Sequence, residues 1–150
     1  MKVFKHMKTL KFIIILISLL YSNICYAQSG WFWQNPYPIG SHIKDCFFIN
    51  SYTGYACGDN GSIIKTSNAG INWIQLNSDG NNFLTSIFFT NQFTGYITSG
   101  NNRFLSVSNI LKTTNGGVNW NEIFTFPNTH LSSVAFYNDS LGYATGGKYT

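Results

Sequence analysis

Apolar residues along this chain alternate with polar ones in short runs, and three of these runs resemble one another. They read DCFFIN from Asp45, SIFFTN from Ser86 and SVAFYN from Ser133. Alternation over four to eight residues is typical of a half-buried β-strand. Since no sustained helical period occurs after residue 27, the pattern predicts an all-β protein.

Each run leads into a further element that begins with Gly-Tyr. An Asn-x-x-x-Gly turn starts at Asn50, Asn91 and Asn138, and the segments GYACG, GYITSG and GYATGG follow as predicted second strands. In the first copy Asn60-Gly61 comes next, which is a strong hairpin signal, and it leads to a predicted third strand, SIIKT.

A nine-residue phrase then occurs twice, as KTSNAGINW from Lys65 to Trp73 and as KTTNGGVNW from Lys112 to Trp120. It turns the chain into a predicted fourth strand, NWIQL or NWNEI. Units of about 40 to 50 residues with four antiparallel strands are typical of β-propeller blades. A parallel β-helix is the main competitor, but its rungs are shorter. We therefore predict a β-propeller of four-stranded antiparallel blades.

The first 27 residues have the layout of a cleaved secretory signal. Four lysines accompany an apolar core from Phe12 to Tyr21, and Cys25-Tyr26-Ala27 gives a small-x-small cleavage pattern. A membrane span needs about 20 apolar residues, so a signal is favoured over an anchor. We expect export to an extracellular, cell-surface or periplasmic location, a mature chain from Gln28, and no membrane span in that mature chain.

The mature part, residues 28–150, divides according to the repeat. We expect a closing strand and lead-in over residues 28–42, blade 1 over 43–83, blade 2 over 84–130 and the start of blade 3 over 131–150. The prediction is thus an N-terminal propeller fragment of about two and a half blades plus a closing strand.

Charge gives no support to a nucleic-acid partner. Four of the nine Lys and Arg residues lie in the predicted signal, and the other five balance the five Asp and Glu residues. The formal net charge of +4 therefore comes from the export signal, and the mature chain has no basic excess that would attract nucleic acid.

The repeated phrase resembles the Asp-box, or BNR, repeat, whose pattern is Ser/Thr-x-Asp-x-Gly-x-Thr-Trp. The matching residues are Thr66, Asn68, Gly70, Asn72 and Trp73 in the first copy and Thr113, Asn115, Gly117, Asn119 and Trp120 in the second. Asn68 and Asn115 stand where the pattern has Asp. The Gly-Tyr-Ala-x-Gly and Ile-x-Lys-Thr elements resemble more specifically the photosystem II stability/assembly factor-like propellers of secreted bacterial proteins. Over residues 43–150 this resemblance implies a propeller and a role as an assembly or stability factor.

We interpret the phrase as a structural turn and not as a catalytic motif. An Asn side-chain oxygen is expected to accept a hydrogen bond from the backbone N–H two residues on. Gly70 and Gly117 are expected to adopt positive φ, and Trp73 and Trp120 to bury their rings beside the turn.

Residues for catalysis are not recognisable in the sequence. A sialidase-like site uses several Arg to hold a carboxylate, whereas Arg103 is the one Arg and Glu122 the one Glu of this chain. The Asp residues form no recognisable catalytic pair, and His42 and His130 have no spaced metal-ligating partners. We predict no enzyme activity, no metal and no cofactor. The alternative is a glycan-acting, sialidase-like hydrolase whose catalytic residues lie in blades missing from this chain.

Candidate binding loops lie where the strand 2–3 and strand 4–1 connections of a meander share one face. The strand 2–3 segment of the second copy, GNNRFLSVSN, is longer than GDNG of the first. The residues expected on this face are Asn81, Asn82, Phe83, Asn101, Asn102, Arg103, Phe104 and His130. A planar cation and an aromatic ring beside amides suit an unknown protein or glycan partner. A tolerated surface insertion is the alternative.

Two cysteines remain after removal of the predicted signal. Cys46 and Cys57 fall on adjacent predicted strands of one hairpin. A disulfide and a pair of buried thiols both fit this placement.

Overall fold

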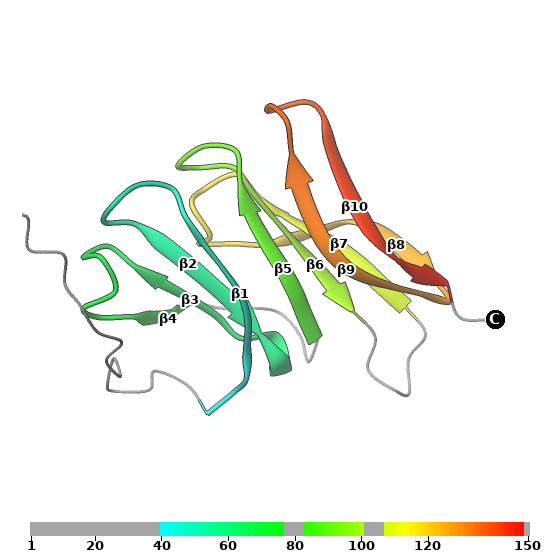
Figure 1. Ribbon diagram of the computed structural model, residues 1–150, viewed down its shortest axis with the longest axis horizontal. Coiled ribbons are helices and arrows are strands. Elements are labelled where there is room, and N and C mark those ends of the chain that lie inside the picture. The colour runs from blue at the N-terminus through cyan, green and yellow to red at the C-terminus, as the bar shows by residue number, and fades with distance from the viewer. Residues whose placement is uncertain (1–39, 77–82, 101–106, 149–150) are drawn as a thin grey trace, which may run out of the picture. The chain divides into compact units, whose positions relative to one another are not determined.

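The computed structural model describes residues 40–76, 83–100 and 107–148, and Figure 1 shows their course. Most of these residues lie in β-strands. The strands are β1 (Ile43–Phe48), β2 (Gly54–Gly58), β3 (Ile63–Thr66), β4 (Ile74–Leu76), β5 (Phe83–Phe89), β6 (Gly95–Gly100), β7 (Val107–Thr113), β8 (Asn121–Pro127), β9 (Thr129–Phe136) and β10 (Gly142–Lys148). One short 3-10 turn, η1 (Asp59–Gly61), joins β2 to β3.

The strands form three meandering sheets, which we call blades 1, 2 and 3. In chain order, β1 to β4 form blade 1, β5 to β8 form blade 2, and the β9–β10 hairpin forms blade 3. All neighbouring strands are antiparallel. The predicted all-β fold of four-stranded antiparallel sheets is therefore confirmed.

The fourth strands differ from the five-residue segments that the sequence predicts. β4 has three residues and β8 has seven. β8 extends because it pairs with β7 from Lys112 to Val107, which lies opposite Pro127, whereas β3 offers four residues to β4. The Asn and Trp that end each phrase belong to the turn and not to the strand.

A Phe near the end of each first strand explains the Gly of each Gly-Tyr pair. The Phe ring lies so close that a Cβ added to the Gly would collide with it. The pairs, with the shortest distance from that added Cβ to the ring, are Gly54–Phe48 (2.7 Å), Gly95–Phe89 (2.6 Å) and Gly142–Phe136 (2.5 Å). Only Gly fits where another group approaches a strand so closely.

The Tyr residues of the first two pairs pack on the Phe of the following blade. Tyr55 stacks on Phe89 with ring centroids 4.0 Å apart, and Tyr96 stacks on Phe136 at the same separation. Gly therefore makes room for the Phe of its own blade, while Tyr covers the Phe of the next one. The buried core that includes Tyr55 consists of Tyr55, Cys57, Ile63, Leu84, Ile87, Phe89, Ile97 and Trp120.

Asp45 on β1 ties blade 1 to blade 2. Its Oδ2 accepts hydrogen bonds from Ser86 Oγ at 2.8 Å and from the backbone N–H of Ile87 at 2.9 Å. Its Oδ1 accepts a hydrogen bond from the N–H of Cys46 at 2.8 Å. Bonds to an ionised acceptor are stronger than neutral ones, so this carboxylate contributes to the association of the two sheets.

Cys46 and Cys57 are free thiols, so the disulfide alternative is wrong. The alternative of two buried thiols holds for Cys57 but is wrong for Cys46, which is exposed. The register pairs Cys46 with Ala56 and Cys57 with Asp45, so the two cysteines are one residue out of step. Because side chains alternate along a strand, they point to opposite faces of the sheet. Burial raises the pKa of the Cys57 thiol, and the charges of Asp45 and Cys46 raise it further.

Candidate binding face

The two copies of the phrase build the same hydrogen-bonded turn, and a Thr hydroxyl lies at the centre of each. Thr66 Oγ1 accepts hydrogen bonds from the N–H of Gly70 at 2.9 Å and of Asn68 at 3.3 Å, and it donates to Asn68 Oδ1 at 3.0 Å. Thr113 makes the equivalent bonds to Gly117 and Asn115, at 3.0, 3.3 and 2.9 Å.

The Asn side chain of the phrase acts over a longer span than predicted. Asn68 Oδ1 accepts a hydrogen bond from the N–H of Asn72, four residues on, and Asn115 Oδ1 accepts one from Asn119. The expected bond to the N–H two residues on is wrong. In the first copy that N–H belongs to Gly70, which already donates to the Thr66 hydroxyl.

Two successive residues of each turn adopt positive φ. They are Ala69 and Gly70 in the first copy, at 58° and 84°, and Gly116 and Gly117 in the second, at 68° and 84°. In blade 2 the Gly116 carbonyl accepts hydrogen bonds from blade 1, from Tyr55 Oη at 2.9 Å and Lys65 Nζ at 3.5 Å. The turn therefore joins neighbouring blades as well as neighbouring strands, a role that the sequence did not reveal.

The two Trp rings differ in burial. Trp120 is 7% exposed and lies edge-on to Phe89, with centroids 5.9 Å apart. Trp73 lies edge-on to Phe48 at 6.1 Å but is only half-buried. The expectation that both rings are buried is wrong for Trp73, because no described blade covers the turn of blade 1.

The turns lie at the end of the blades that also carries the strand 1–2 loops. The N–H of Ala69 donates to the Tyr52 carbonyl at 2.8 Å, and that of Gly116 donates to the Phe93 carbonyl at 2.9 Å. In these loops the side-chain oxygens of three Asn residues accept hydrogen bonds from the N–H groups two and three residues on. These residues are Asn50, Asn91 and Asn138. We call this end the turn face.

The opposite end carries the strand 2–3 turns and the segments that enter the first strands. In blade 1 the N–H of Asp59 donates to the His42 carbonyl at 2.9 Å. In blade 2, Phe83 of β5 lies opposite Gly100 of β6. We call this end, with His42, Asp59, Phe83, Gly100 and His130, the loop face.

Phe83 and His130 are the two predicted binding residues that the structure describes, and both are half-buried. His130 lies inside β9, the first strand of blade 3, whereas the repeat pattern places it at the end of blade 2. Next to it, the Leu131 carbonyl accepts a hydrogen bond from Thr85 Oγ1 at 2.9 Å, which fixes blade 3 to blade 2. The other predicted residues, Asn81, Asn82, Asn101, Asn102, Arg103 and Phe104, lie outside the described residues.

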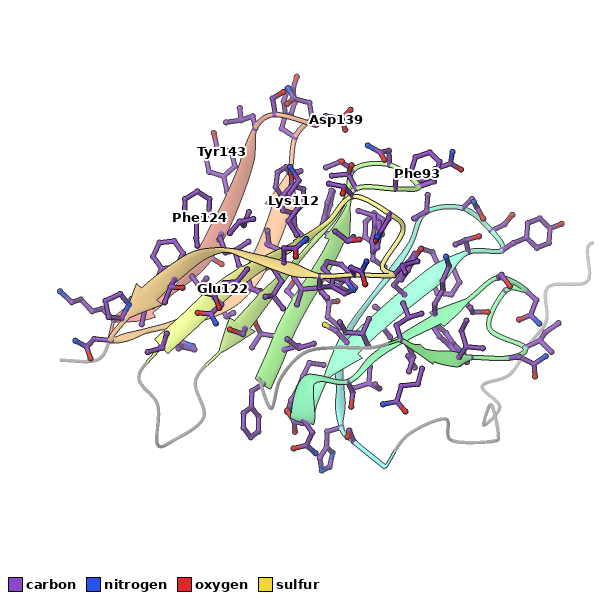
Figure 2. The ribbon with its side chains drawn as sticks, turned by 180° about the vertical axis from the view of Figure 1, so that it is seen from behind. Phe93, Lys112, Glu122, Phe124, Asp139 and Tyr143 are labelled. Carbon is purple, nitrogen blue, oxygen red and sulfur yellow. The ribbon has the colours of Figure 1, made fainter. Side chains whose placement is uncertain are left out.

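The described carboxylates are dispersed and mostly engaged. Asp45 is held by blade 2, Asp59 pairs with Lys44 at 3.4 Å, and Glu122 accepts hydrogen bonds from Asn109 Nδ2 and Thr125 Oγ1. Figure 2 shows Glu122 and Asp139 on separate elements and well apart. Within the described part of the chain the structure therefore offers no pair of carboxylates for glycoside hydrolysis.

Metal and membrane features can be judged for the same part of the chain. Among residues 40–76, 83–100 and 107–148, no three or more His, Cys, Asp or Glu side chains gather closely enough to hold a metal ion. These residues also contain no helix of the length and hydropathy that a membrane span requires.

Comparison with known proteins gives a likeness in fold. No family model and no curated protein matches the chain. A solved structure described as YCF48 bound to D1 peptide is similar, with a TM-score of 0.60 and 22% identity over 71% of this chain and 35% of that one. YCF48 from Cyanidioschyzon merolae is similar with a TM-score of 0.62 and 15% identity, over 73% of this chain and 36% of that one.

The chain thus spans about a third of the length of these YCF48 structures. At these identities the likeness concerns the fold, and it agrees with the sheets described above. The predicted β-propeller architecture is confirmed.

Proposed function

We propose that this chain is part of an exported, non-catalytic β-propeller that binds a protein partner as a scaffold or assembly-factor-like module. The observation that carries the proposal is the likeness in fold to a YCF48 structure that holds a peptide. A fold hosts many functions, so the peptide of that structure indicates a class of partner and not its identity.

The loop face is the part of the chain that we propose to bind the partner. The polar backbone groups of the turn face are largely used within and between blades, as at Gly70 and Gly116. The loop face holds Phe83 and His130, and the long segment with Arg103 and Phe104 follows Gly100. An Arg and aromatic side chains are the residue types that most often dominate protein interfaces.

The glycan-acting alternative gains no support from the described residues. Asp45 accepts three hydrogen bonds and takes part in blade association, and Glu122 lies on the outer strand β8 with partners of its own. Neither carboxylate is placed as an acid or nucleophile beside a second one.

Selection from peptide and glycan libraries tests this function. The exported protein is immobilised and offered a displayed peptide library and, separately, a glycan array. The proposal expects enrichment of related peptides and no glycan signal. Enrichment of glycans with no peptide consensus would refute it.

Variants then place the binding site. The double variant Arg103→Ala, Phe104→Ala is expected to weaken binding of the selected peptide about tenfold or more, because Arg and aromatic contacts often contribute over 1 kcal/mol each. Tyr52→Ser and Ile71→Ser on the turn face are matched controls, since these side chains are 66% and 72% exposed. Weakening by the controls alone would exclude the loop face.

Export is a separate part of the proposal. It is supported by the lysines, apolar core and cleavage pattern of residues 1–27. Expression of the whole chain in an export-competent bacterium should give a protein whose N-terminal sequence begins at Gln28. An intact N-terminus in the cytoplasmic fraction would contradict export.

A further inference from the structure

The dipeptide Asn-Gly occurs twice in this chain, as Asn60-Gly61 and as Asn115-Gly116. In this dipeptide the Asn side chain is readily attacked by the backbone nitrogen of the next residue, because Gly has no side chain to block the approach. The first copy lies in η1, the strand 2–3 turn of blade 1, on the loop face. The second lies in the turn between β7 and β8. The two copies can therefore be compared within one molecule.

The surroundings of the two copies are similar in two respects. Both Asn residues are exposed, and both Gly residues are buried. Both Gly residues also adopt positive φ, at 66° for Gly61 and 68° for Gly116. Neither exposure nor the conformation of the Gly distinguishes the copies. What differs is how firmly the Asn side chain is held.

The side chain of Asn115 is fixed in the turn. Its Oδ1 accepts hydrogen bonds from Thr113 Oγ1 at 2.9 Å and from the N–H of Asn119 at 3.0 Å. The nitrogen of Gly116, which would be the attacking atom, donates its hydrogen to the Phe93 carbonyl at 2.9 Å. An attack within this turn must break these hydrogen bonds, so the folded state protects Asn115.

The side chain of Asn60 is held by a weaker contact. Its Nδ2 donates to Ser41 Oγ at 3.4 Å, which is longer than the usual N–H···O distance of about 2.7 to 3.2 Å. Asn60 itself has a φ of 58°. Asp tolerates this left-handed conformation as Asn does, so the turn is compatible with a carboxylate at this position.

We propose that Asn60 is a site of spontaneous deamidation in the folded protein. The backbone nitrogen of Gly61 loses its proton and forms a bond to Cγ of Asn60. The bond from Cγ to Nδ2 breaks, and Nδ2 takes up a proton and leaves as ammonia. Water then opens the resulting succinimide ring at one of its two carbonyl carbons, which gives Asp or isoaspartate at position 60. The sum is addition of water and loss of ammonia, with no oxidant or reductant.

Both products place a carboxylate on the loop face, where the structure has a neutral amide. The new charge arises next to Asp59, whose Oδ1 pairs with Lys44 at 3.4 Å. The isoaspartate product also lengthens the backbone of the turn by one methylene group. Deamidation needs no bound partner, so this modification site goes beyond the proposed function.

Peptide mapping by mass spectrometry tests the proposal on the whole chain. The protein is incubated at mildly alkaline pH, once folded and once in urea, and the peptides that contain Asn60 and Asn115 are followed. In the folded protein the Asn60 peptide should gain the mass that exchange of NH2 for OH brings, and should separate into Asp and isoaspartate forms. It should convert at least about tenfold faster than the Asn115 peptide, because hydrogen bonds hold Asn115. In urea the two rates should be similar.

Asn60→Gln is the matched variant. The Gln side chain is one methylene longer, so attack by the next nitrogen forms a larger and less favoured ring. The corresponding peptide of this variant should keep its mass, which assigns the gain in the native chain to Asn60. Circular dichroism before incubation shows that the variant is folded.

Three results would overturn the proposal. The first is an Asn60 peptide that keeps its mass in the folded protein but converts in urea. The second is equal conversion of Asn60 and Asn115 in the folded protein, since the hydrogen bonds of the second turn would then give no protection. The third is a mass gain that persists in Asn60→Gln, which would place the modification at another residue.

Discussion

At the scale of the residue, a Thr hydroxyl is the main anchor of each repeated turn. Thr66 and Thr113 are almost completely buried at the ends of β3 and β7. Each hydroxyl accepts hydrogen bonds from two backbone N–H groups. The side-chain oxygen of the Asn instead accepts a hydrogen bond from the N–H four residues on. The sequence pattern contains both the Thr and the Asn. Their local chemistry did not predict which of the two side-chain oxygens accepts a hydrogen bond from which backbone N–H.

Thr113→Val should destabilise the fold because it leaves the N–H groups of Asn115 and Gly117 without their acceptor. We expect the free energy of unfolding to fall by about 1 to 3 kcal/mol. Urea denaturation measures this change. Thr114→Val is the control, since Thr114 is exposed and should change stability by less than about 0.5 kcal/mol. Equal losses at both positions would contradict the role of the buried hydroxyl.

Gly95→Ala should be destabilising for a steric reason. The new Cβ would lie 2.6 Å from the Phe89 ring, which is held between Tyr55 and Trp120. Displacing this ring should cost about 1 to 3 kcal/mol of unfolding free energy. Gly40→Ala is the matched control, because nothing lies within 4 Å of its added Cβ. A neutral Gly95→Ala would show that the ring moves without cost.

The buried Cys57 thiol predicts a pH dependence of stability. Burial raises its pKa in the folded state, so at alkaline pH the unfolded state releases a proton that the folded state keeps. The contribution of this thiol to stability is therefore fully present below the unfolded pKa of about 8.5. Above that pH the free energy of unfolding falls, by up to about 1.4 kcal/mol per pH unit. Urea denaturation between about pH 8 and 9.5 should show this slope for the native chain but not for Cys57→Ala. The same slope in both proteins would assign it to another group.

At the scale of the element, the strands were predictable because three copies of the pattern support one another. The Gly-Tyr strands begin at Gly54, Gly95 and Gly142 as predicted. The ends of β4 and β8 were not predictable, because they depend on how far the partner strand extends. The hydrogen bond from the Tyr55 hydroxyl to the Gly116 carbonyl was also not predictable from the sequence, since it links residues 61 apart in different blades.

The contacts of Asp45 with the neighbouring sheet were likewise not predictable from the sequence. The sequence showed a carboxylate where the other copies have Ser86 and Ser133, but not its partners on β5. We predict that Asp45→Ala lowers the free energy of unfolding by about 1 to 3 kcal/mol, because the Ile87 N–H loses its acceptor.

Chemical denaturation measures the effect of Asp45→Ala, with Asp139→Ala as the control. Asp139 lies exposed in the β9–β10 turn, so its removal should change stability little. If Asp45→Ala is as stable as Asp139→Ala, the carboxylate does not hold the two blades together.

At the scale of the whole molecule, the fold follows from the repeat, but the partner does not. The repeat defines blades, and the turns it encodes are explained by folding. A binding surface is instead made by residues that differ between copies, such as the segment around Arg103, and these have no internal counterpart from which a role can be read. The likeness to the YCF48 structure concerns the fold, and the protein partner and its place on the loop face are what we propose.

Hydrogen exchange with and without the selected peptide tests the central claim most directly. The account predicts slower exchange on the loop face, at Phe83, Gly100 and His130, and no change in the repeated turns. Slower exchange confined to the turns at residues 66–73 and 113–120, with the loop face unchanged, would contradict it.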